Sequence, residues 1–269
     1  PMQGAVEDDG IDSFRTDCKA GLNLIHIDPF KDPGVSSIDY AAKISSDLIR
    51  ECLNENPDVL FEIGSEEAIF SYSHEYLNDF LSACRQNLGE EIFQNSIAFA
   101  VVQCGTALAG DTNTGSFDEK RLQRMTEVCK FHNVLSKEHN GDYLDEEEFK
   151  LRFRIGLDAL NIAPEFGTDE TKILLSMFEE AGDSKSKEDF YNLCQESRKW
   201  EKWIGKDFVA DSEDKKKELS ICSGHYVFGS SKFSEIKDRE YYRQIDEIAF
   251  EHHYRKLSNF LRHIDEEIS

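Results

Sequence analysis

The stretch LSKEHNGDYL, residues 135–144, places several titratable side chains next to one another. His139 is a candidate metal ligand, because a neutral imidazole suits zinc and its second ring nitrogen is usually held by a carboxylate. Glu138 or Asp142 could provide that carboxylate. The alternative is a polar turn in which Asp142 caps the helix that follows. The residue types leave both interpretations open.

His26 and Asp28 form a second candidate pair, separated by one residue in LIHID. Residues i and i+2 of a strand point to the same face, so the two side chains could bind a metal or a substrate hydroxyl together. The alternative is a buried histidine that is satisfied by the aspartate. These two interpretations carry equal weight.

Two more polar residues follow expected strands. Glu66, after the glycine of FEIG, could accept a sugar hydroxyl or act as a general base. It could equally be an acid at a helix N-terminus, where the helix dipole favours negative charge. Gln103 is expected to point towards the top of the sheet and to bind a ligand hydroxyl.

A phosphate group would need backbone N–H groups from a glycine-rich loop or a helix N-terminus. The segments GTALAGDTNTG (105–115) and PEFGTDET (164–171) are the candidates. The second is the better one, because it opens a helix for which Thr168 is the expected N-cap. Gly167 and Thr168 are therefore expected to bind substrate.

Short apolar runs alternate along the chain with segments of helical periodicity. We expect strands at 22–28, 59–64, 96–105, 134–139 and 159–164. We expect helices at 37–56, 73–88, 117–133, 144–156 and 168–182. Ser73 is the expected N-cap of the second of these helices, and Gly156 and Gly182 are expected to end the last two. This alternation predicts βα units and a parallel sheet.

The polar candidates fall at or just after the C-terminal ends of these strands, which is where (β/α)8 TIM barrels build their active sites. A doubly wound sheet would favour a glycine-rich phosphate turn after its first strand, and the chain has neither G-x-G-x-x-G nor a P-loop. We therefore predict an α/β fold of the TIM-barrel type.

About five βα units are visible, whereas a barrel needs eight. The predicted organisation is a partial barrel domain at 1–182 and a helical C-terminal extension at 183–269, in which 184–205 is expected to form one helix carrying both tryptophans. The first three units are expected to lie upstream of Pro1.

The net charge and composition of the chain limit the classes of partner that it can bind. The chain has 269 residues and a net charge of -23, which repels nucleic acid and anionic membrane surfaces. No apolar run approaches the roughly 20 residues of a membrane span. Seven scattered cysteines without a C-x-x-C pair indicate free thiols and a cytoplasmic location, with Cys52, Cys84 and Cys129 in the core.

Five stretches in order resemble the class II D-tagatose-1,6-bisphosphate aldolase family, and more narrowly its non-catalytic (Z-type) subunit. They are LIHIDP, FEIGSEE, AVVQCG, KEHNGDYL and LNIAPEFGTDETKILL, and the resemblance covers roughly residues 10 to 180. The chain departs from the family pattern in TALAGD after Gly105 and in NIAP at Asn161. These departures point to a divergent branch that acts on, or supports chemistry on, another sugar phosphate.

The resemblance implies a TIM barrel, a divalent metal such as Zn²⁺ that polarises a substrate carbonyl, and a sugar phosphate or bisphosphate as substrate. It implies catalytic roles for Glu66, Glu138 and Asp142, and metal binding by His26, Asp28 and His139. It implies substrate binding by Gln103, Lys137, Tyr143, Gly167 and Thr168.

Two functions follow from the resemblance. The first is an accessory, stabilising subunit for a separate catalytic aldolase chain. The alternative is a metal-dependent aldolase or sugar-phosphate epimerase in its own right. An inactive fragment is a third interpretation. Bound metal is the observation that separates these functions.

Overall fold

The computed structural model describes residues 11–32, 34–67, 69–237 and 244–268. The chain forms two compact units. The first contains residues up to Ala107, together with 115–140 and 151–161. The second contains residues 108–114, 141–150 and everything from Ile162 onwards. This division differs from the predicted boundary at residue 182, because helix α7 (Pro164–Glu180) lies in the second unit.

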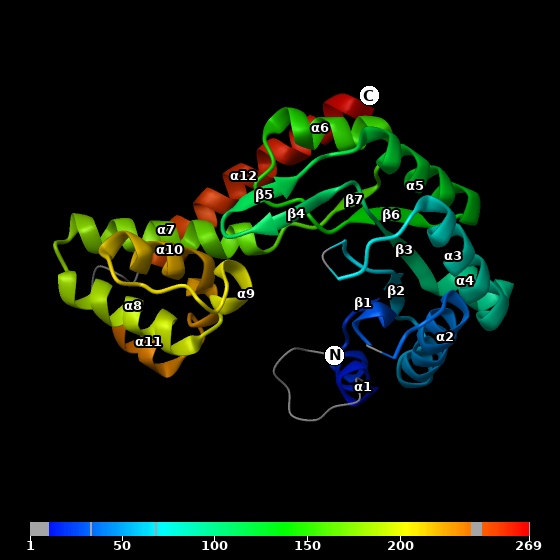
Figure 1. Cartoon of the computed structure of the whole chain (residues 1–269), viewed down its shortest axis with the longest axis horizontal. Coiled ribbons are helices and arrows are strands. Elements are labelled where there is room, and N and C mark those ends of the chain that lie inside the picture. The colour runs from blue at the N-terminus through cyan, green and yellow to red at the C-terminus, as the bar shows by residue number, and fades with distance from the viewer. Residues whose placement is uncertain (1–10, 33, 68, 238–243, 269) are drawn as a thin grey trace. The chain divides into compact units, whose positions relative to one another are not determined.

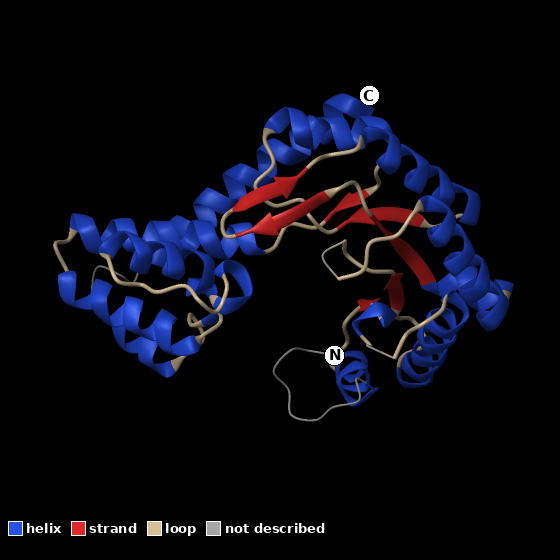
Figure 2. Cartoon of the chain, viewed as in Figure 1, coloured by secondary structure: helices blue, strands red, loops and turns tan. Residues whose placement is uncertain are grey.

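The first unit is built on a five-stranded parallel sheet in the order β1-β2-β3-β6-β7 (Figures 1 and 2). Its strands are β1 (Leu24–Ile27), β2 (Leu60–Ile63), β3 (Ile97–Val102), β6 (Leu135–Glu138) and β7 (Ala159–Leu160). Its helices are α1 (Ile11–Lys19), α2 (Ile38–Glu55), α3 (His74–Leu88), α4 (Glu90–Ser96) and α5 (Glu119–His132), with a 3-10 turn η1 (Pro29–Lys31) after β1. The predicted βα alternation and parallel sheet are confirmed.

Most helices begin where the sequence predicts. Ser37 and Ser73 accept hydrogen bonds from the N–H groups of Tyr40 and Tyr76 and so cap α2 and α3. Helix α6 (Glu146–Ile155) ends before Gly156, whose φ of 107° lies in the region that favours glycine. Helix α4 was not predicted, because its seven residues are too few to show a helical period.

The two faces of the sheet differ in chemistry. Ile25, Ile27 and Phe61 face the helices and belong to the main hydrophobic core. Alternate residues on the other face include His26 and Glu62, which are paired in register across β1 and β2. An alternation of this kind sends the apolar side chains to the core and the polar ones to the opposite face.

The second unit is helical around its own apolar core. It contains α7, α8 (Ser184–Ser197), α9 (Glu201–Ile204), α10 (Glu213–Ser223), η2 (Gly224–Tyr226), α11 (Ser231–Lys237) and α12 (Ile245–Ile268). Its core includes Leu174, Phe178, Phe190 and Phe233. The helical character of the tail was correctly predicted, but the single helix expected at 184–205 is wrong, because it breaks between α8 and α9.

Two further segments differ in structure from the expectation. The segment 105–115, a candidate phosphate loop, carries the two-stranded hairpin β4 (Thr106–Ala109) and β5 (Thr112–Gly115). Thr168 does not cap a helix, because α7 begins earlier, at Pro164, and the Thr168 hydroxyl donates to the Pro164 carbonyl within the first turn.

All seven cysteines are free and buried, and Cys52, Cys84 and Cys129 lie in the core of the first unit as predicted. Within the residues that the structure describes, no helix is both long enough and apolar enough to cross a membrane.

Candidate metal centre at the strand ends

Three side chains from separate strands converge on the face of the sheet opposite the helices. His26 comes from β1, Glu62 from β2 and His139 from the first position after β6. One ligand atom from each lies within 4.8 Å of the others. The parallel register brings them together, because it places the C-terminal ends of these strands at one edge of the sheet.

Glu62 is the centre of the cluster. Its Oε1 bonds Nε2 of His139, and its Oε2 accepts a hydrogen bond of 2.6 Å from Nζ of Lys137. The side chain of Glu62 is buried, and the lysine and histidine side chains are largely so. A carboxylate can be buried in this way only because charged and polar partners satisfy both of its oxygens.

The hydrogen bond of His26 fixes its tautomer. Its Nε2 lies 3.0 Å from the carbonyl oxygen of Gly64, so Nε2 must carry the proton and donate. The other ring nitrogen, Nδ1, is then left with its lone pair. Metal-binding histidines typically donate their second ring N–H to a backbone carbonyl in this manner.

At neutral pH the protonation states of His26 and Glu62 allow both side chains to bind a metal ion. Burial, followed by the nearby charge of His139, lowers the pKa of His26 to about 4, so the imidazole is neutral. Burial on its own would raise the pKa of Glu62, but the hydrogen bond and charge of His139, with smaller contributions from His26 and Lys137, lower it to about 2. Two imidazoles and one ionised carboxylate form a donor set that zinc and other divalent metals accept.

Asp28 lies apart from this cluster, although His26 belongs to it. The strand ends at Ile27, and the backbone turns into η1. The Asp28 carboxylate accepts from the N–H of Phe30 and from the Ser65 hydroxyl, both at 3.0 Å. The i, i+2 rule therefore fails at the position where the chain leaves the strand.

Glu138 sits between Lys137 and His139 in the sequence, but it points to the other face of β6. There it forms a buried ion pair with Arg152 at 2.8 Å and accepts hydrogen bonds from Cys104 and Thr106. These contacts join β6 to α6 and to the segment after β3. They leave Glu138 away from the His26, Glu62 and His139 cluster.

Gln103 is held by backbone groups of the segment that follows β2. Its amide nitrogen donates to the carbonyls of Ser65 and Phe70, and its oxygen accepts from the N–H of Tyr72 and from Arg121. These bonds occupy the amide group that was expected to bind a ligand hydroxyl.

Within the described part of this segment, Glu67 is the acid whose side chain forms an ion pair and accepts a hydrogen bond. Glu67 pairs with Arg121 at 2.5 Å and accepts from the N–H of Gly105 at 2.8 Å. Glu66 contributes its carbonyl, which accepts hydrogen bonds from Ile69 and Phe70.

The remaining predicted residues gather in the second unit, around the start of α7. Asp142 Oδ1 accepts from the N–H groups of Ala163 and Glu165, at 2.9 and 2.8 Å, and so occupies the helix N-terminus that was expected to bind phosphate. Tyr143 adopts a positive φ of 59°, and its hydroxyl lies 2.8 Å from that of Thr168.

Gly167 allows α7 to pack closely against η2. A Cβ added at Gly167 would lie 2.4 Å from the Cβ of His225, so only glycine lets α7 approach η2 this closely. The sequence predicted a substrate contact at Gly167, and the structure shows a steric requirement for glycine at this position.

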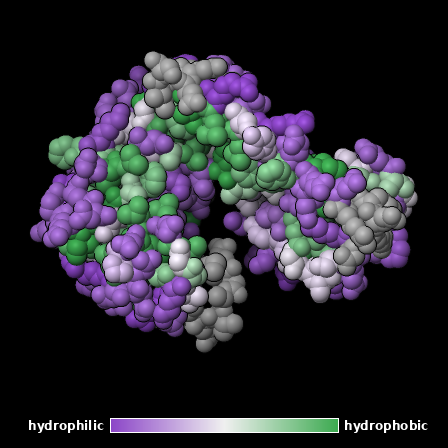
Figure 3. All heavy atoms as spheres, turned by 180° about the vertical axis from the view of Figure 1, so that it is seen from behind, coloured by the Kyte–Doolittle hydropathy of each residue, from purple (hydrophilic) through white to green (hydrophobic). Residues whose placement is uncertain are grey.

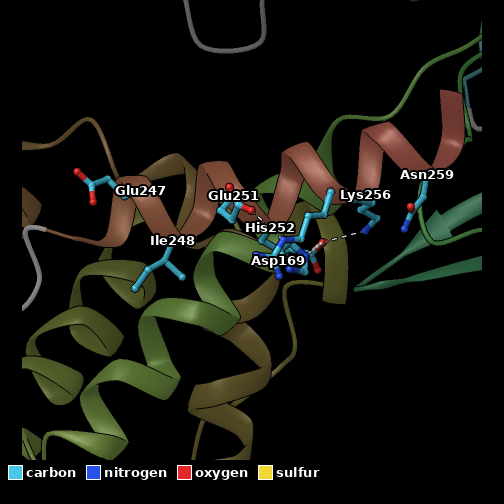
Figure 4. A pocket seen from close by; sticks show the side chains of 8 residues that line it. Asp169, Glu247, Ile248, Glu251, His252, Lys256 and Asn259 are labelled. Atoms are coloured by element: carbon cyan, nitrogen blue, oxygen red, sulfur yellow. Dashed lines mark hydrogen bonds and ion pairs between the residues drawn. The ribbon is translucent and has the colours of Figure 1, made fainter. Parts of the chain in front are cut away.

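Another group of charges lies along α12. A pocket of about 910 Å³ is lined by Asp169 of α7 and by side chains of α12 (Figure 4). Lys256 bonds both Asp169, at 2.8 Å, and Glu165, and His252 lies 3.2 Å from Asp169. The central charges of this pocket thus satisfy one another.

The sequence analysis did not name Glu62 as a candidate metal ligand. The available signal was an acid inside the apolar run VLFEIG, since a charged residue in a buried strand requires a partner. The identity of its partners depends on the order of the strands.

No family model and no curated protein matches the chain. Among solved structures, it is similar to a probable tagatose 6 phosphate kinase from Sinorhizobium meliloti 1021, with a TM-score of 0.70 and 15% identity over 100% of this chain and 78% of that one. It is also similar to the fructuronate-tagaturonate epimerase UxaE from Cohnella laeviribosi with two bound glycerols, with a TM-score of 0.53 and 9% identity over 98% of this chain and 65% of that one. At these sequence identities the similarity shows the fold alone. The chain has a TIM-barrel-like α/β fold and spans 78% and 65% of the length of these two neighbours.

Proposed function

We propose that this chain is a metal-dependent, aldolase-type protein that acts on a sugar phosphate by making or breaking a carbon–carbon bond. One observation carries the proposal: His26, Glu62 and His139 converge at the C-terminal strand ends, with Lys137 beside them. The resemblance of five ordered motifs to class II tagatose-bisphosphate aldolases supports the substrate class.

Each residue of the cluster has a distinct role in this proposal. His26 and His139 offer imidazole nitrogens, and Glu62 offers an ionised carboxylate. When bound, a divalent ion such as Zn²⁺ supplies a Lewis acid for a substrate carbonyl. Lys137 holds Oε2 of Glu62 in place and adds a positive charge that attracts the anionic substrate.

Metal content tests the site. The purified chain is loaded with zinc, manganese or cobalt, dialysed and measured by inductively coupled plasma mass spectrometry. The wild type should retain about one ion per chain, whereas Glu62→Gln and His139→Ala should retain far less. Glu75→Gln, which changes an exposed acid of α3, is the matched control. Equal retention by all four proteins would refute the site.

Activity is followed by NMR with tagatose and fructose bisphosphates, which distinguishes cleavage from epimerisation. Turnover that depends on the retained metal and disappears in His139→Ala supports a catalytic chain. Metal retention without any conversion rejects catalysis on these substrates.

A second candidate function is that of the accessory subunit. It is favoured by the commitment of Glu138 to Arg152 and of Asp142 to the start of α7, since both acids were expected to be catalytic. In this case the chain should bind a class II tagatose-bisphosphate aldolase chain and raise its melting temperature, without converting sugar itself.

A further inference from the structure

Helix α12 carries an apolar stripe that nothing among the described residues of the second unit covers. Phe250, Tyr254, Leu257 and Leu261 are 69%, 59%, 43% and 62% exposed. Phe250 and Tyr254 stack on each other along the helix, with ring centroids 6.1 Å apart. Figure 3 views the side on which α12 runs and shows hydrophobic side chains at the surface. Contiguous exposed apolar side chains mark interaction surfaces.

The stripe is separate from the face with which α12 contacts α7. That face carries Ile245 and Ala249, which are buried, and Lys256, which pairs with Asp169 and Glu165. At 100° per residue the apolar surface of α12 therefore extends well beyond the part that α7 covers. Phe260 of α12 stacks on Phe149 of α6, with ring centroids 4.4 Å apart. The exposed stripe lies outside both of these contacts and so presents a face to one more neighbour.

The spacing of the apolar residues along the stripe indicates which kind of structural element would pack against it. The steps from Phe250 to Tyr254, Leu257 and Leu261 are four, three and four residues. This is the alternation of core positions in a heptad repeat, through which one helix packs side by side against another. The stripe spans about 17 Å at 1.5 Å per residue, or roughly three turns.

The flanking charges specify its orientation. Glu247 and Glu251 lie on one flank of the stripe in its first half, and Arg262 lies on the same flank beyond its end. In an antiparallel pair like flanks meet, so the acidic half of one helix faces the basic half of the other. Because Glu251 already bonds Arg255 at 2.9 Å, Glu247 is the main partner for Arg262.

We propose that α12 is a self-association surface, on which a second copy of this chain packs its own α12 in antiparallel orientation about a twofold axis between Tyr254 and Leu257. This axis places Phe250 opposite Leu261 of the second copy, and Arg262 between Glu247 and Glu251. The surface is self-complementary, as a twofold interface requires. The inference is independent of the proposed metal site.

The oligomeric state of the full chain tests the surface by sedimentation velocity over a range of concentrations. Because the interface is small, we expect a monomer–dimer equilibrium with a dissociation constant on the order of micromolar. Leu257→Glu should raise that constant by about 100-fold, since symmetry places two changed residues in each interface. Phe131→Glu, which changes a 78% exposed phenylalanine on α5, should leave it unchanged.

Cross-linking tests the orientation. All seven native cysteines are buried, so introduced cysteines dominate the reaction. A mixture of Phe250→Cys and Leu261→Cys should form a disulfide-linked dimer, whereas Phe250→Cys alone should not. A dimer from Phe250→Cys alone would overturn the antiparallel arrangement.

A charge exchange provides a second test that does not depend on the apolar residues. Arg262→Glu should weaken the dimer, and adding Glu247→Arg to the same chain should restore it. Circular dichroism establishes that each variant is folded. A wild-type chain that stays monomeric up to millimolar concentration, or a dimer that Leu257→Glu leaves intact, would overturn the proposal.

Discussion

Nζ of Lys137 lies 2.6 Å from Oε2 of Glu62, although 75 residues separate them along the chain. The same carboxylate bonds His139 through its other oxygen. Strand β3 lies between β2 and β6 in the sheet, so the contact crosses a strand that contributes neither partner. Glu62 is thereby oriented from both sides, and such pre-organisation is what the proposed metal site needs.

The proposed function requires that replacing Lys137 by methionine weakens the binding of sugar phosphates. The variant keeps the length of the side chain and its apolar contacts but removes the ammonium, which is largely buried. A charged hydrogen bond contributes about 1.5–3 kcal/mol, so the dissociation constant should rise by about 10- to 100-fold. Isothermal titration with fructose 1,6-bisphosphate measures the change, and Lys43→Met, at an exposed site, is the control. An affinity equal to that of the wild type would contradict the role given to Lys137.

The ion pair between Glu138 and Arg152 should be essential for stability. Both side chains are almost fully buried, with 2.8 Å between Arg152 Nε and Glu138 Oε2. Arg152→Met leaves the carboxylate buried without its cation, which should cost about 3–5 kcal/mol of the free energy of unfolding. Urea denaturation measures the loss.

Two further variants complete this experiment. Arg152→Met with Glu138→Gln should recover part of the loss, because no uncompensated charge remains. Lys43→Met breaks an exposed pair with Asp47 and should cost at most about 1 kcal/mol. Equal effects of Arg152→Met and Lys43→Met would show that the buried pair has no special role.

The sequence predicts the elements of the sheet well because local signals determine them. Branched apolar runs mark the strands, and the side chains of Ser37 and Ser73 mark helix starts. The hairpin at 106–115 was missed because its residues alternate only weakly and its glycines resemble those of a loop. Long elements with strong periods are predicted more securely than short ones.

The site is harder to predict because it depends on which way each strand-end side chain points. His26 and His139 were identified from residue type and position. Glu138 follows Lys137 directly and therefore points to the opposite face of β6. The sequence alone does not show which of the two faces carries the cluster. Asp142 was correctly considered as a helix cap, but the helix it caps is α7 and not the next one along the chain.

Gly105 should be intolerant of a side chain. Its φ is +90°, and an added Cβ would lie 2.3 Å from the backbone oxygen of Ser116, which cannot move away without disrupting the hairpin. Gly105→Ala should therefore lower the free energy of unfolding by more than the roughly 1 kcal/mol that a strained backbone angle alone costs.

Gly110 provides the matched comparison. It also has a positive φ, of +59°, but an added Cβ would meet nothing within 4 Å. Gly110→Ala should show the backbone cost without the steric one. Thermal and urea unfolding of both variants measure the difference, and the prediction fails if Gly110→Ala is the more damaging change.

Asp142 should make the stability of the protein depend on pH. Burial raises its pKa to about 6, although the N–H groups of Glu165 and Ala163 oppose the shift. Its Oδ2 is buried and has no hydrogen-bond partner within the described part of the chain. The unfolded chain has a pKa of about 3.9 at this residue, so the folded state binds more protons between the two values. This contribution to stability is complete below about pH 4 and is lost as the pH rises through about 6.

The substitution Asp142→Asn isolates the contribution that ionisation of Asp142 makes to the pH dependence of stability. The amide oxygen can still accept from Ala163 and Glu165, but the side chain cannot ionise. The free energy of unfolding of the variant minus that of the wild type should therefore become more favourable as the pH rises from about 4 to about 6. Asp169→Asn should show the opposite sign and at lower pH: burial favours the neutral acid, but the hydrogen bonds from Lys256 and His252 outweigh it and lower the pKa of Asp169. The contribution of Asp169 to stability is therefore present above about pH 4 and is lost as the pH falls below that value. A difference for Asp142→Asn that stays constant across this range would show that Asp142 remains ionised in the folded protein.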